Sequence, residues 1–460
     1  MAADLKPPSF WLQTCGDSLR PRPSLCGDEQ VDVAIVGAGY TGLWSAYYLK
    51  RARPSLRIVV LEREFAGYGA SARNGGWLAG SLEGPARVYE RSGGPAGLLA
   101  LRRAMFDTVD EVGRVLAAEG IDADYLKSGH LDVALNDAQA ARLRARLAAA
   151  HESGFGEHDL RAVEAEQMEA RLRVSGARLA TFTPHVARVH PARLLAGLRS
   201  AVERLGVSVY ERTCVRELRP REALTPAGAV RARWVIRATE GYTPGLGRLK
   251  RALVPVNSSM VITEPLAPGV WEEIGWTASE LLGDAAHVFV YLQRTADGRI
   301  AIGGRGVPYR FASRTDRSGE TAPATVATLA RKLAEMFPAA ATAALDHAWS
   351  GVLGVPRDWC PSVGADENTG LAWAGGYAGL GVAAANLAGR TLRDLVLEEP
   401  SELTSLPWVG RQSRRWEPEP LRWLAIRGIY SLYREADRAE GRSGKPSRLG
   451  ALLDALSGRR

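Results

Sequence analysis

The chain has 460 residues, of which 46% are hydrophobic and 24% are charged. These proportions are typical of a soluble globular protein, and the length suggests two or three domains. No apolar run reaches the roughly 18 residues of a membrane-spanning helix, and the first 20 residues lack the basic start and apolar core of a secretory signal. We therefore expect a cytoplasmic protein without a transmembrane segment.

The net charge of +8 raises the question of a nucleic-acid partner. Residues 401–460 carry 12 Lys and Arg against 7 Asp and Glu, so most of the excess belongs to this last segment. Neither an RNP-like aromatic strand nor a zinc finger accompanies it, and basic surfaces are often simply solvated. We predict that nucleic acid is not a partner.

The four cysteines and seven histidines are scattered along the chain. The cysteines form no C-x-x-C pair, which suits a reducing compartment. The histidines form no H-E-x-x-H motif or other ligand spacing. We predict neither a disulfide framework nor a metal site.

The chain begins with an arm and a strand–helix–strand unit. Residues 1–27 are rich in proline and are predicted to form an irregular arm over the body. Residues 31–37 (VDVAIVG) predict a strand, residues 39–52 (GYTGLWSAYYLKRA) a helix and residues 57–64 (RIVVLERE) a second strand. Such a βαβ unit is the nucleus of a parallel sheet.

The next part of the chain is mainly helical. Helical periodicity dominates residues 99–169, interrupted by one strand candidate at residues 130–135 (HLDVAL). A helix over residues 191–206 then leads into strands within residues 207–218 and 231–242. A helix followed by strands extends a doubly wound sheet.

Between residues 251 and 310 the hydrophobic alternation changes to a period of two. Residues 258–264, 286–295 and 298–306 show it, with a hairpin turn at Ala296-Asp297-Gly298. These segments predict a separate antiparallel sheet, which a helix over residues 324–338 follows. The tail from residue 403 onward is predicted to be helical and basic, with its apolar side packed on the body or on a second subunit rather than on a membrane.

Three glycines follow the first predicted strand, in the pattern G-x-G-x-x-G. Gly37, Gly39 and Gly42 would let a pyrophosphate approach the backbone, and Glu62 ends the second strand 20 residues later. An acid at that place accepts hydrogen bonds from a ribose and repels a 2′-phosphate, so NADP is disfavoured. The pattern predicts a dinucleotide site but does not by itself distinguish NAD from FAD.

A second glycine-rich turn distinguishes the two cofactors. Residues 67–77 (GYGASARNGGW) come shortly after Glu62. NAD needs no second loop there, whereas the longer FAD must be held beyond its ribose. Here the chain resembles the glycine and D-amino-acid oxidase superfamily of FAD proteins, in the branch that includes sarcosine oxidases and γ-glutamylputrescine oxidoreductase.

The resemblance continues in three later segments. Thr213-Cys214-Val215 is similar to the family's strand beside the adenine, and residues 238–242 (ATEGY) are similar to its second turn. Residues 370–389 (GLAWAGGYAGLGVAAANLAG) are similar to the closing segment, where a helix N-terminus faces the flavin pyrimidine and stabilises its negative charge. The resemblance implies a cofactor site made by Gly37, Gly39, Tyr40, Thr41, Gly42, Glu62, Arg63, Gly69, Ala70, Ser71, Arg73, Asn74, Gly75, Gly76, Val215, Ala238, Thr239, Gly241, Gly376, Gly379, Leu380 and Gly381.

We expect the FAD to be bound without a covalent link. Relatives that tether it are similar through a His in the first glycine loop or a Cys just after the late Trp-x-Gly. This chain has Arg73-Asn74 and Trp349-Ser350-Gly351-Val352 at those places.

Together these features predict an α/β fold: a doubly wound, Rossmann-type FAD-binding sheet, a substrate domain with a mainly antiparallel sheet plus helices, and a helical C-terminal tail. We expect an arm (1–27), a discontinuous FAD-binding domain (28–85, 178–245 and 346–400), a substrate domain (86–177 and 246–345) and a basic extension (401–460).

The resemblance implies oxidation of an amine by hydride transfer to flavin N5, giving an imine that hydrolyses. Orientation carries such catalysis, so no acid–base signature is required. For the substrate wall the sequence offers Tyr291, Trp349 and Tyr377, whose rings could contact an ammonium group. Any of the three could equally be core packing.

Several residues depart from the family pattern. Relatives clamp a substrate carboxylate with an Arg in Trp-x-Gly-x-Arg-Pro, but here Leu353 takes that place, which disfavours a simple α-amino acid. The run 299–303 (RIAIG) lacks the Lys with which sarcosine oxidases promote oxygen reduction, and Leu380 stands where many relatives have His. The electron acceptor is therefore left open between oxygen and another molecule, and the oligomeric state is also open.

Two alternatives remain. One is a flavin monooxygenase or natural-product oxidoreductase that uses NAD(P)H, although no second nucleotide motif is visible. The other is a role in binding nucleic acid or a membrane through the basic tail.

Overall fold

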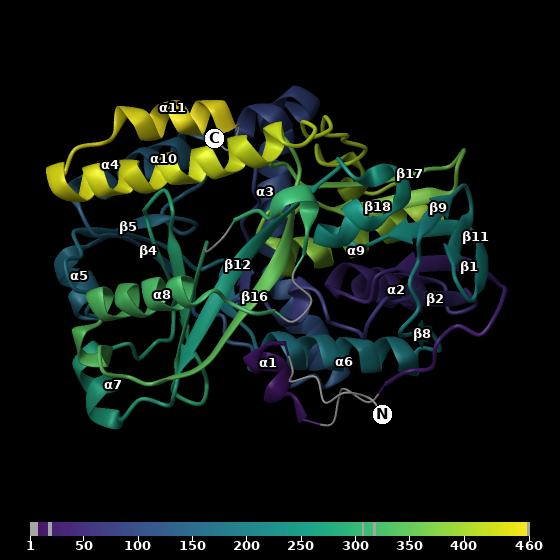
Figure 1. The fold of residues 1–460 in the computed structure, drawn as a ribbon, viewed down its shortest axis with the longest axis horizontal. Coiled ribbons are helices and arrows are strands. Elements are labelled where there is room, and N and C mark those ends of the chain that lie inside the picture. The colour runs from purple at the N-terminus through teal and green to yellow at the C-terminus, as the bar shows by residue number, and fades with distance from the viewer. Residues whose placement is uncertain (1–7, 17–20, 306–307, 316–318, 458–460) are drawn as a thin grey trace.

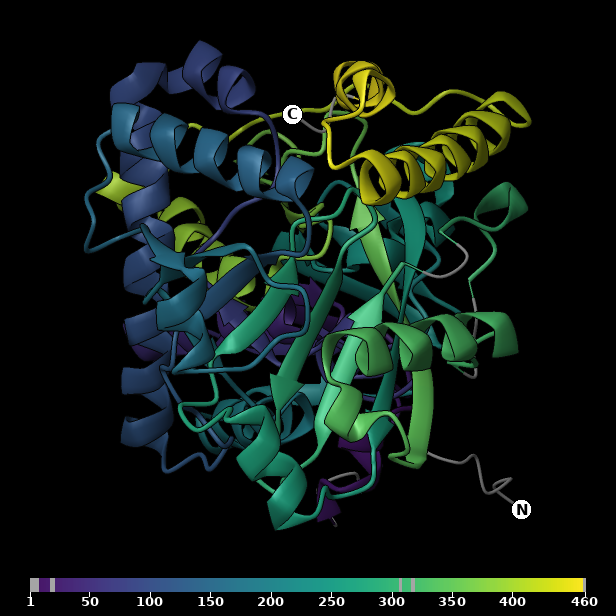
Figure 2. The ribbon, with the colours of Figure 1, turned by 90° about the vertical axis from the view of Figure 1, so that its left-hand side faces the viewer.

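The computed structural model describes residues 8–16, 21–305, 308–315 and 319–457. Two large sheets lie side by side, one on the right and one on the left of Figure 1. Helices α10 and α11 of the tail lie above the left-hand sheet in Figure 1. Figure 2 shows this second sheet face-on, behind its helices.

The first sheet is mainly parallel and contains the predicted βαβ unit. Its central strands β11, β1, β2 and β8 run parallel, whereas the hairpin β9–β10 and strand β17 pair antiparallel. Its strands are, in order, β17 (Ser362–Asp366), β18 (Leu371–Gly375), β11 (Gly228–Arg237), β1 (Glu29–Val36), β2 (Ile58–Leu61) and β8 (Ser208–Tyr210), with β10 (Glu222–Thr225) and β9 (Glu217–Arg219) attached to β11.

Both faces of this sheet are buried, which explains why its strands are almost continuously apolar. Val33 and Ile35 of β1 face a core shared with helices α2, α3, α6 and α9, whereas Ala34 and Val36 face a smaller core beneath the β9–β10 hairpin. One layer of helices and one layer of strands therefore enclose the sheet.

The second sheet is antiparallel except where β13 pairs with β4. The predicted turn at residues 296–298 joins β14 to β15, as the period-two pattern indicated. Its strands are, in order, β16 (Leu345–Val355), β12 (Val254–Thr263), β15 (Ile300–Gly304), β14 (Val290–Arg294), β13 (Leu281–Asp284), β4 (His130–Ala134), β6 (Leu179–Thr183) and β5 (Arg161–Glu164). A small ribbon, β3 (Trp77–Ala79) with β7 (Val186–Arg188), contacts helices α3 and α9 and strand β13 of the second sheet.

The described α-helices are α1 (Phe10–Gln13), α2 (Tyr40–Ala52), α3 (Ala86–Glu119), α4 (Asp137–Glu152), α5 (Ala165–Glu169), α6 (Pro191–Arg204), α7 (Pro268–Ile274), α8 (Pro323–Met336), α9 (Gly381–Leu397), α10 (Leu421–Ser443) and α11 (Arg448–Ser457). None of the helices in the described ranges is long and apolar enough to cross a membrane.

Three local features differ from the sequence-based expectation. The arm is not wholly irregular, because Ser9 caps the short helix α1, whose apolar residues are buried. Residues 213–215 form a loop between β8 and β9 rather than a strand. The amide of Thr213 donates to the carbonyl of Glu62, but these residues belong to no ladder of paired strands. Strands β6 and β16, which we placed in the FAD-binding ranges, pair within the second sheet.

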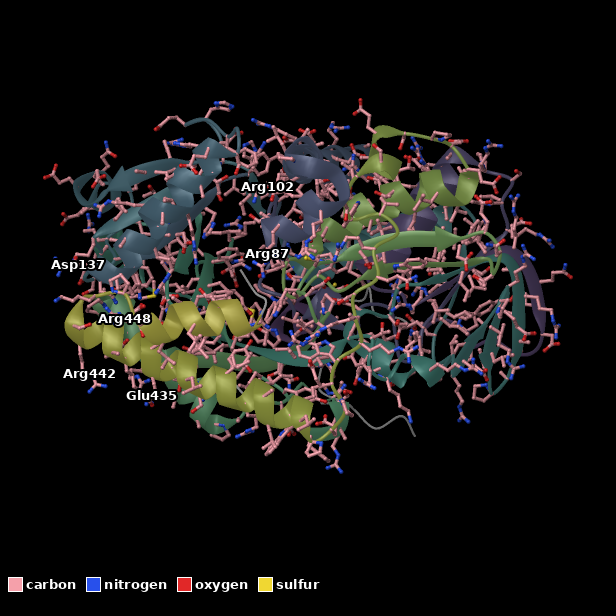
Figure 3. The ribbon with its side chains drawn as sticks, turned by 90° about the horizontal axis from the view of Figure 1, so that it is seen from above. Arg87, Arg102, Asp137, Glu435, Arg442 and Arg448 are labelled. Atoms are coloured by element: carbon pink, nitrogen blue, oxygen red, sulfur yellow. The ribbon has the colours of Figure 1, made fainter. Side chains whose placement is uncertain are left out.

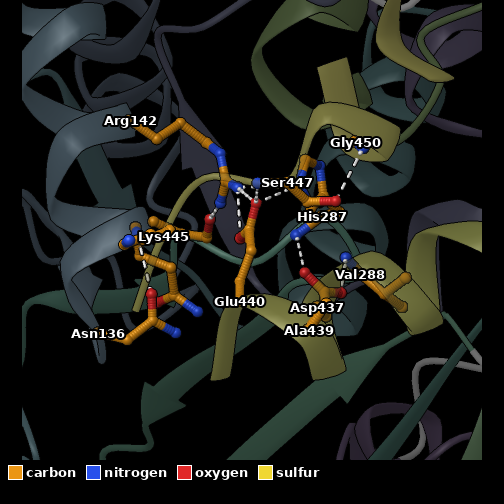
Figure 4. A network of polar contacts seen from close by, with 12 residues as sticks. Asn136, Arg142, His287, Val288, Asp437, Ala439, Glu440, Lys445, Ser447 and Gly450 are labelled. Atoms are coloured by element: carbon orange, nitrogen blue, oxygen red, sulfur yellow. Dashed lines mark hydrogen bonds and ion pairs between the residues drawn. The ribbon is translucent and has the colours of Figure 1, made fainter. Parts of the chain in front are cut away.

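The tail is fastened to the body by a buried ion pair. Glu440 of α10 accepts hydrogen bonds from Arg142 of α4 at 2.6–2.8 Å, and the two side chains are only 2% and 11% exposed (Figure 4). Asp437 accepts the amides of His287 and Val288. Although His287, Asp437 and Glu440 converge, the carboxylates already have these partners, so we propose no metal there. Glu435 and Arg442 point away from the body (Figure 3).

Candidate cofactor and substrate site

A deep cavity opens at the carboxyl ends of β1 and β2, where ligands bind in open α/β sheets. It encloses about 1220 Å³, its mouth included, and reaches across to β16 of the second sheet. Of the residues predicted to bind the cofactor, those that line it are Gly37, Gly39, Tyr40, Thr41, Glu62, Arg63, Gly69, Ala70, Ser71, Asn74, Val215, Ala238, Thr239, Gly241, Gly379 and Gly381.

The first glycine turn has a steric reason for two of its glycines. Gly37 has a φ of +110°, and a Cβ there would lie 2.5 Å from the carbonyl oxygen of Ala238. A Cβ on Gly42 would lie 1.9 Å from the carbonyl oxygen of Gly37. Only glycine therefore lets α2 begin this close to β1, with its first-turn N–H groups directed at the cavity.

Polar contacts fix the two sides of the turn. The carboxylate of Glu62 accepts hydrogen bonds from the backbone amides of Ala38 at 2.9 Å and Glu64 at 3.1 Å. Burial raises the pKa of this carboxyl group. The hydroxyl of Ser71 accepts the amide of Tyr40 at 2.9 Å. The second glycine loop is thereby tied to the start of α2.

The second loop is also held from behind, through three consecutive carbonyl groups. The indole of Trp11 donates to the carbonyl of Asn74 at 2.8 Å, Gln293 donates to that of Gly75 at 2.6 Å, and the amide of Val189 donates to that of Gly76 at 2.9 Å. The arm, the second sheet and the segment before α6 thus each fix one residue of the loop.

Glu240 closes the far end of the cavity. Its carboxylate accepts the amides of Gly354, Gly376 and Tyr377 at 2.8–3.3 Å, so it joins the turn after β11 to β16 and to the segment before α9. Burial, opposed by these hydrogen bonds, raises its pKa to about 7. Beyond it, the N-terminal amides of α9 border the cavity at Gly381.

Several lining residues were not among those predicted, although most adjoin the predicted motifs. Tyr68 and Tyr242 line the wall, and the guanidinium of Arg63 lies 5.0 Å from the ring centre of Tyr242. The signal was present for these two tyrosines, inside GYGASARNGG and ATEGY. Val352 and Leu353 of β16 also line the cavity. The Trp-x-Gly run marked their place in the sequence, but not which residues they would face, because that depends on how the two sheets meet.

Six predicted cofactor residues do not line the cavity as the structure describes it: Gly42, Arg73, Gly75, Gly76, Gly376 and Leu380. They support its walls instead. The amide of Gly376 donates a hydrogen bond to the carboxylate of Glu240. Leu380 packs against the small apolar cluster of Ala79, Val186 and Leu281. Arg73 is buried, stacks 4.6 Å from the ring centre of Tyr68 and donates to the carbonyl of Ser350.

The three predicted substrate-wall residues lie in different surroundings. Trp349 is fully buried and donates its indole N–H to the carbonyl of Arg73, so we assign it to the core rather than to the wall. Tyr377 lines the cavity but is bound through its hydroxyl to Thr41 at 3.0 Å. Tyr291 packs over Gly75 of the second loop and bonds Ser258 at 2.9 Å.

Residues 32–395 match the model of a protein family described as FAD dependent oxidoreductase. The chain belongs to this family. It is 30% identical to the γ-glutamylputrescine oxidoreductase of Escherichia coli strain K12, over 84% of this chain and 88% of that protein. It is 25% identical to the glycine oxidase of Geobacillus kaustophilus, over 83% and 96%. The crystal structure of a glycine oxidase from Geobacillus kaustophilus superposes with a TM-score of 0.69 at 21% identity, covering 81% of this chain and 96% of that one.

The cavity of this FAD-dependent oxidoreductase fits its cofactor. We propose that the start of α2 would hold the pyrophosphate, Glu62 a ribose, residues 213–215 the adenine and the start of α9 the flavin pyrimidine. The buried hydroxyl of Tyr242 has no hydrogen-bond partner among the described residues, which leaves it available to a bound group. Cys214 lines the adenine end, so a non-covalent FAD remains our prediction.

Proposed function

We propose that this flavoenzyme oxidises a primary or secondary amine. The carrying observation is the chemistry of the cavity wall: its only described acids are Glu62 and Glu240, both occupied by backbone amides, and none of its described residues is His or Lys. A neutral amine already pushes electron density toward its C–H bond, so its oxidation needs no protein base. The names of the two curated relatives above, which concern a putrescine derivative and glycine, support an amine substrate.

Bound FAD would supply a hydride acceptor at N5, with oxygen or another molecule as the final electron acceptor. The amine loses a hydride from carbon and a proton from nitrogen, and water then splits the imine into a carbonyl compound and an amine. The N-terminal amides and the helix dipole of α9, which border the cavity at Gly381, would stabilise negative charge on a flavin held there. Val352 and Leu353 of strand β16 line the cavity with apolar side chains, which would keep water from the reacting atoms.

Anaerobic mixing tests this proposal. The purified, oxidised holoenzyme would be mixed with polyamines, N-methyl amines, γ-glutamyl amines and D-amino acids while the flavin absorbance is followed. We expect bleaching by one of these classes, and readmission of air would show whether oxygen is the acceptor. If NAD(P)H bleaches the flavin and no amine does, the monooxygenase alternative replaces this proposal.

A further inference from the structure

A second cavity lies behind the second glycine loop. It encloses about 870 Å³, its mouth included, and no described residue lines both this cavity and the cofactor cavity. Helix α1, the segment that joins β7 to α6 and the turn of the β14–β15 hairpin form most of its wall. The proposed amine oxidation makes no use of this space.

Three wall residues of the second cavity are the donors that fix the second glycine loop. The indole of Trp11, the side-chain amide of Gln293 and the backbone amide of Val189 hold the consecutive carbonyls of residues 74–76. Asn74 also lines the cofactor cavity, so this stretch of backbone separates the two cavities. A ligand that restrains the three donors would therefore restrain the loop as well.

Arg188 brings a buried positive charge to the wall of the second cavity. The residue is only 8% exposed, and its Nη1 donates to the carbonyl of Arg294 at 3.0 Å. This is the one hydrogen bond of the guanidinium among the described residues, and its Nε is buried without an acceptor. An unpaired buried donor is costly, which points to an acceptor that a ligand brings.

The two carboxylates in this wall are paired with other arginines. Asp124 lies 3.0 Å from Nη1 of Arg193, and Asp297 lies 2.7 Å from Nε of Arg299. Burial lowers the pKa of Arg188, whereas the charges of Asp124 and Asp297 raise it without forming an ion pair. Within the described part of the chain, the charge of Arg188 therefore has no carboxylate of its own.

We propose that the second cavity binds a small oxyanion, a carboxylate or a phosphate group, at Arg188, and that the bound anion steadies the second glycine loop. The Nε and Nη2 edge of a guanidinium carries parallel N–H bonds that match two oxygens of such a group. The rings of Phe10 and Trp11 in the same wall suit the apolar part of an organic anion. This inference does not depend on the substrate of the enzyme, because it concerns a separate cavity.

The test compares four FAD-loaded proteins: the natural chain, Arg188→Leu, Arg188→Lys and Arg442→Leu. The last removes one positive charge on the outer face of the tail and serves as the matched control (Figure 3). Each holoenzyme is titrated with inorganic phosphate and with acetate, at constant ionic strength set with chloride. Isothermal titration calorimetry gives the Kd, and flavin fluorescence gives the temperature at which FAD is released.

We expect the natural chain and Arg442→Leu to bind one oxyanion per chain and to release FAD at a higher temperature as its concentration rises. Arg188→Leu should raise the Kd at least about tenfold and abolish that rise in temperature, and Arg188→Lys should keep part of both. The tighter of the two probes identifies the group as phosphate or carboxylate. If neither probe binds the natural chain, or if Arg188→Leu leaves the Kd unchanged, the inference is overturned.

A variant with the opposite expected effect covers the case in which Arg188→Leu does not retain FAD. Asp297→Asn removes a negative charge near Arg188 and keeps a residue suited to a turn, while Arg299 keeps Asp346 as its partner. It should lower the Kd for the anion roughly threefold. An unchanged Kd in both Asp297→Asn and Arg188→Lys would refute the site, whatever the bleaching experiment shows about amines.

Discussion

Replacing Gly42 with Ala should separate α2 from the turn that begins it. The new Cβ would lie 1.9 Å from the carbonyl oxygen of Gly37, 3.1 Å from its carbon and 3.2 Å from Cγ2 of Ile35. Real Cβ atoms keep about 3.0 Å from such atoms, so the helix must withdraw by about 1 Å. Overpacking of this kind costs about 1–3 kcal/mol, and we expect the upper end because the obstacle is backbone.

The same substitution at Gly428 is the matched control. Gly428 lies within α10 with nothing within 4 Å of a Cβ, so Ala there should raise the free energy of unfolding by about 0.5–1 kcal/mol. Thermal release of FAD, followed by flavin fluorescence, would compare the two variants. If the cost falls on cofactor binding, 3 kcal/mol corresponds to a roughly 150-fold rise in the Kd for FAD. A Gly42→Ala protein with natural FAD content and release temperature would refute the steric argument.

Three further outcomes follow from the contacts described. Glu62→Ala removes the ribose acceptor and should raise the Kd for FAD about tenfold, measured by equilibrium titration of the apoprotein; an unchanged Kd would contradict that assignment. Glu440→Ala leaves Arg142 buried without its carboxylate partner and should destabilise the docked tail by about 3–5 kcal/mol. Glu435→Ala, on the exposed side of the same helix, should change the stability of the tail little. The rate of limited trypsin cleavage within residues 421–457 distinguishes the two variants. Burial raises the pKa of Glu440, but hydrogen bonding to His287, Ser447 and Arg142 outweighs burial and lowers that pKa to about 2. The carboxylate therefore contributes its full stabilisation above its ordinary pKa of 4.5, and this contribution is lost as the pH falls from 4.5 to about 2. Trypsin-independent acid cleavage aside, a tail whose protease cleavage does not increase over that range would contradict this prediction.

The cofactor half of the site could be predicted because its parts are local. Gly37, Gly42 and Glu62 belong to one βαβ unit, whose geometry fixes the distance from the turn to the acid. Gly42 is required by a contact within that unit, with the carbonyl of Gly37, whereas Gly37 is required by Ala238, which follows β11. Family resemblance then supplied the order of the later segments, and the match over residues 32–395 confirms the family.

The substrate half could not be predicted, because it depends on which strands cross. Gln293 of β14 donates to the carbonyl of Gly75, 218 positions earlier in the chain, and nothing in the run VYLQR indicates that neighbour. Trp349 illustrates the converse. Its place in the Trp-x-Gly motif suggested the substrate wall, yet it lies on the part of β16 that packs on Met260 and Trp11. Alternation along a strand predicts a face, but not which layer covers it.

The bond between Trp11 and the carbonyl of Asn74 has a practical consequence for anyone who shortens this protein. The first strand begins at Glu29, so a truncated version starting at residue 28 would preserve every strand of both sheets. It would nevertheless discard the indole that fixes the second glycine loop, residues 67–77. Such a protein would keep both sheets but hold this loop less firmly, so poor turnover by it would not show that the wrong substrate had been tested.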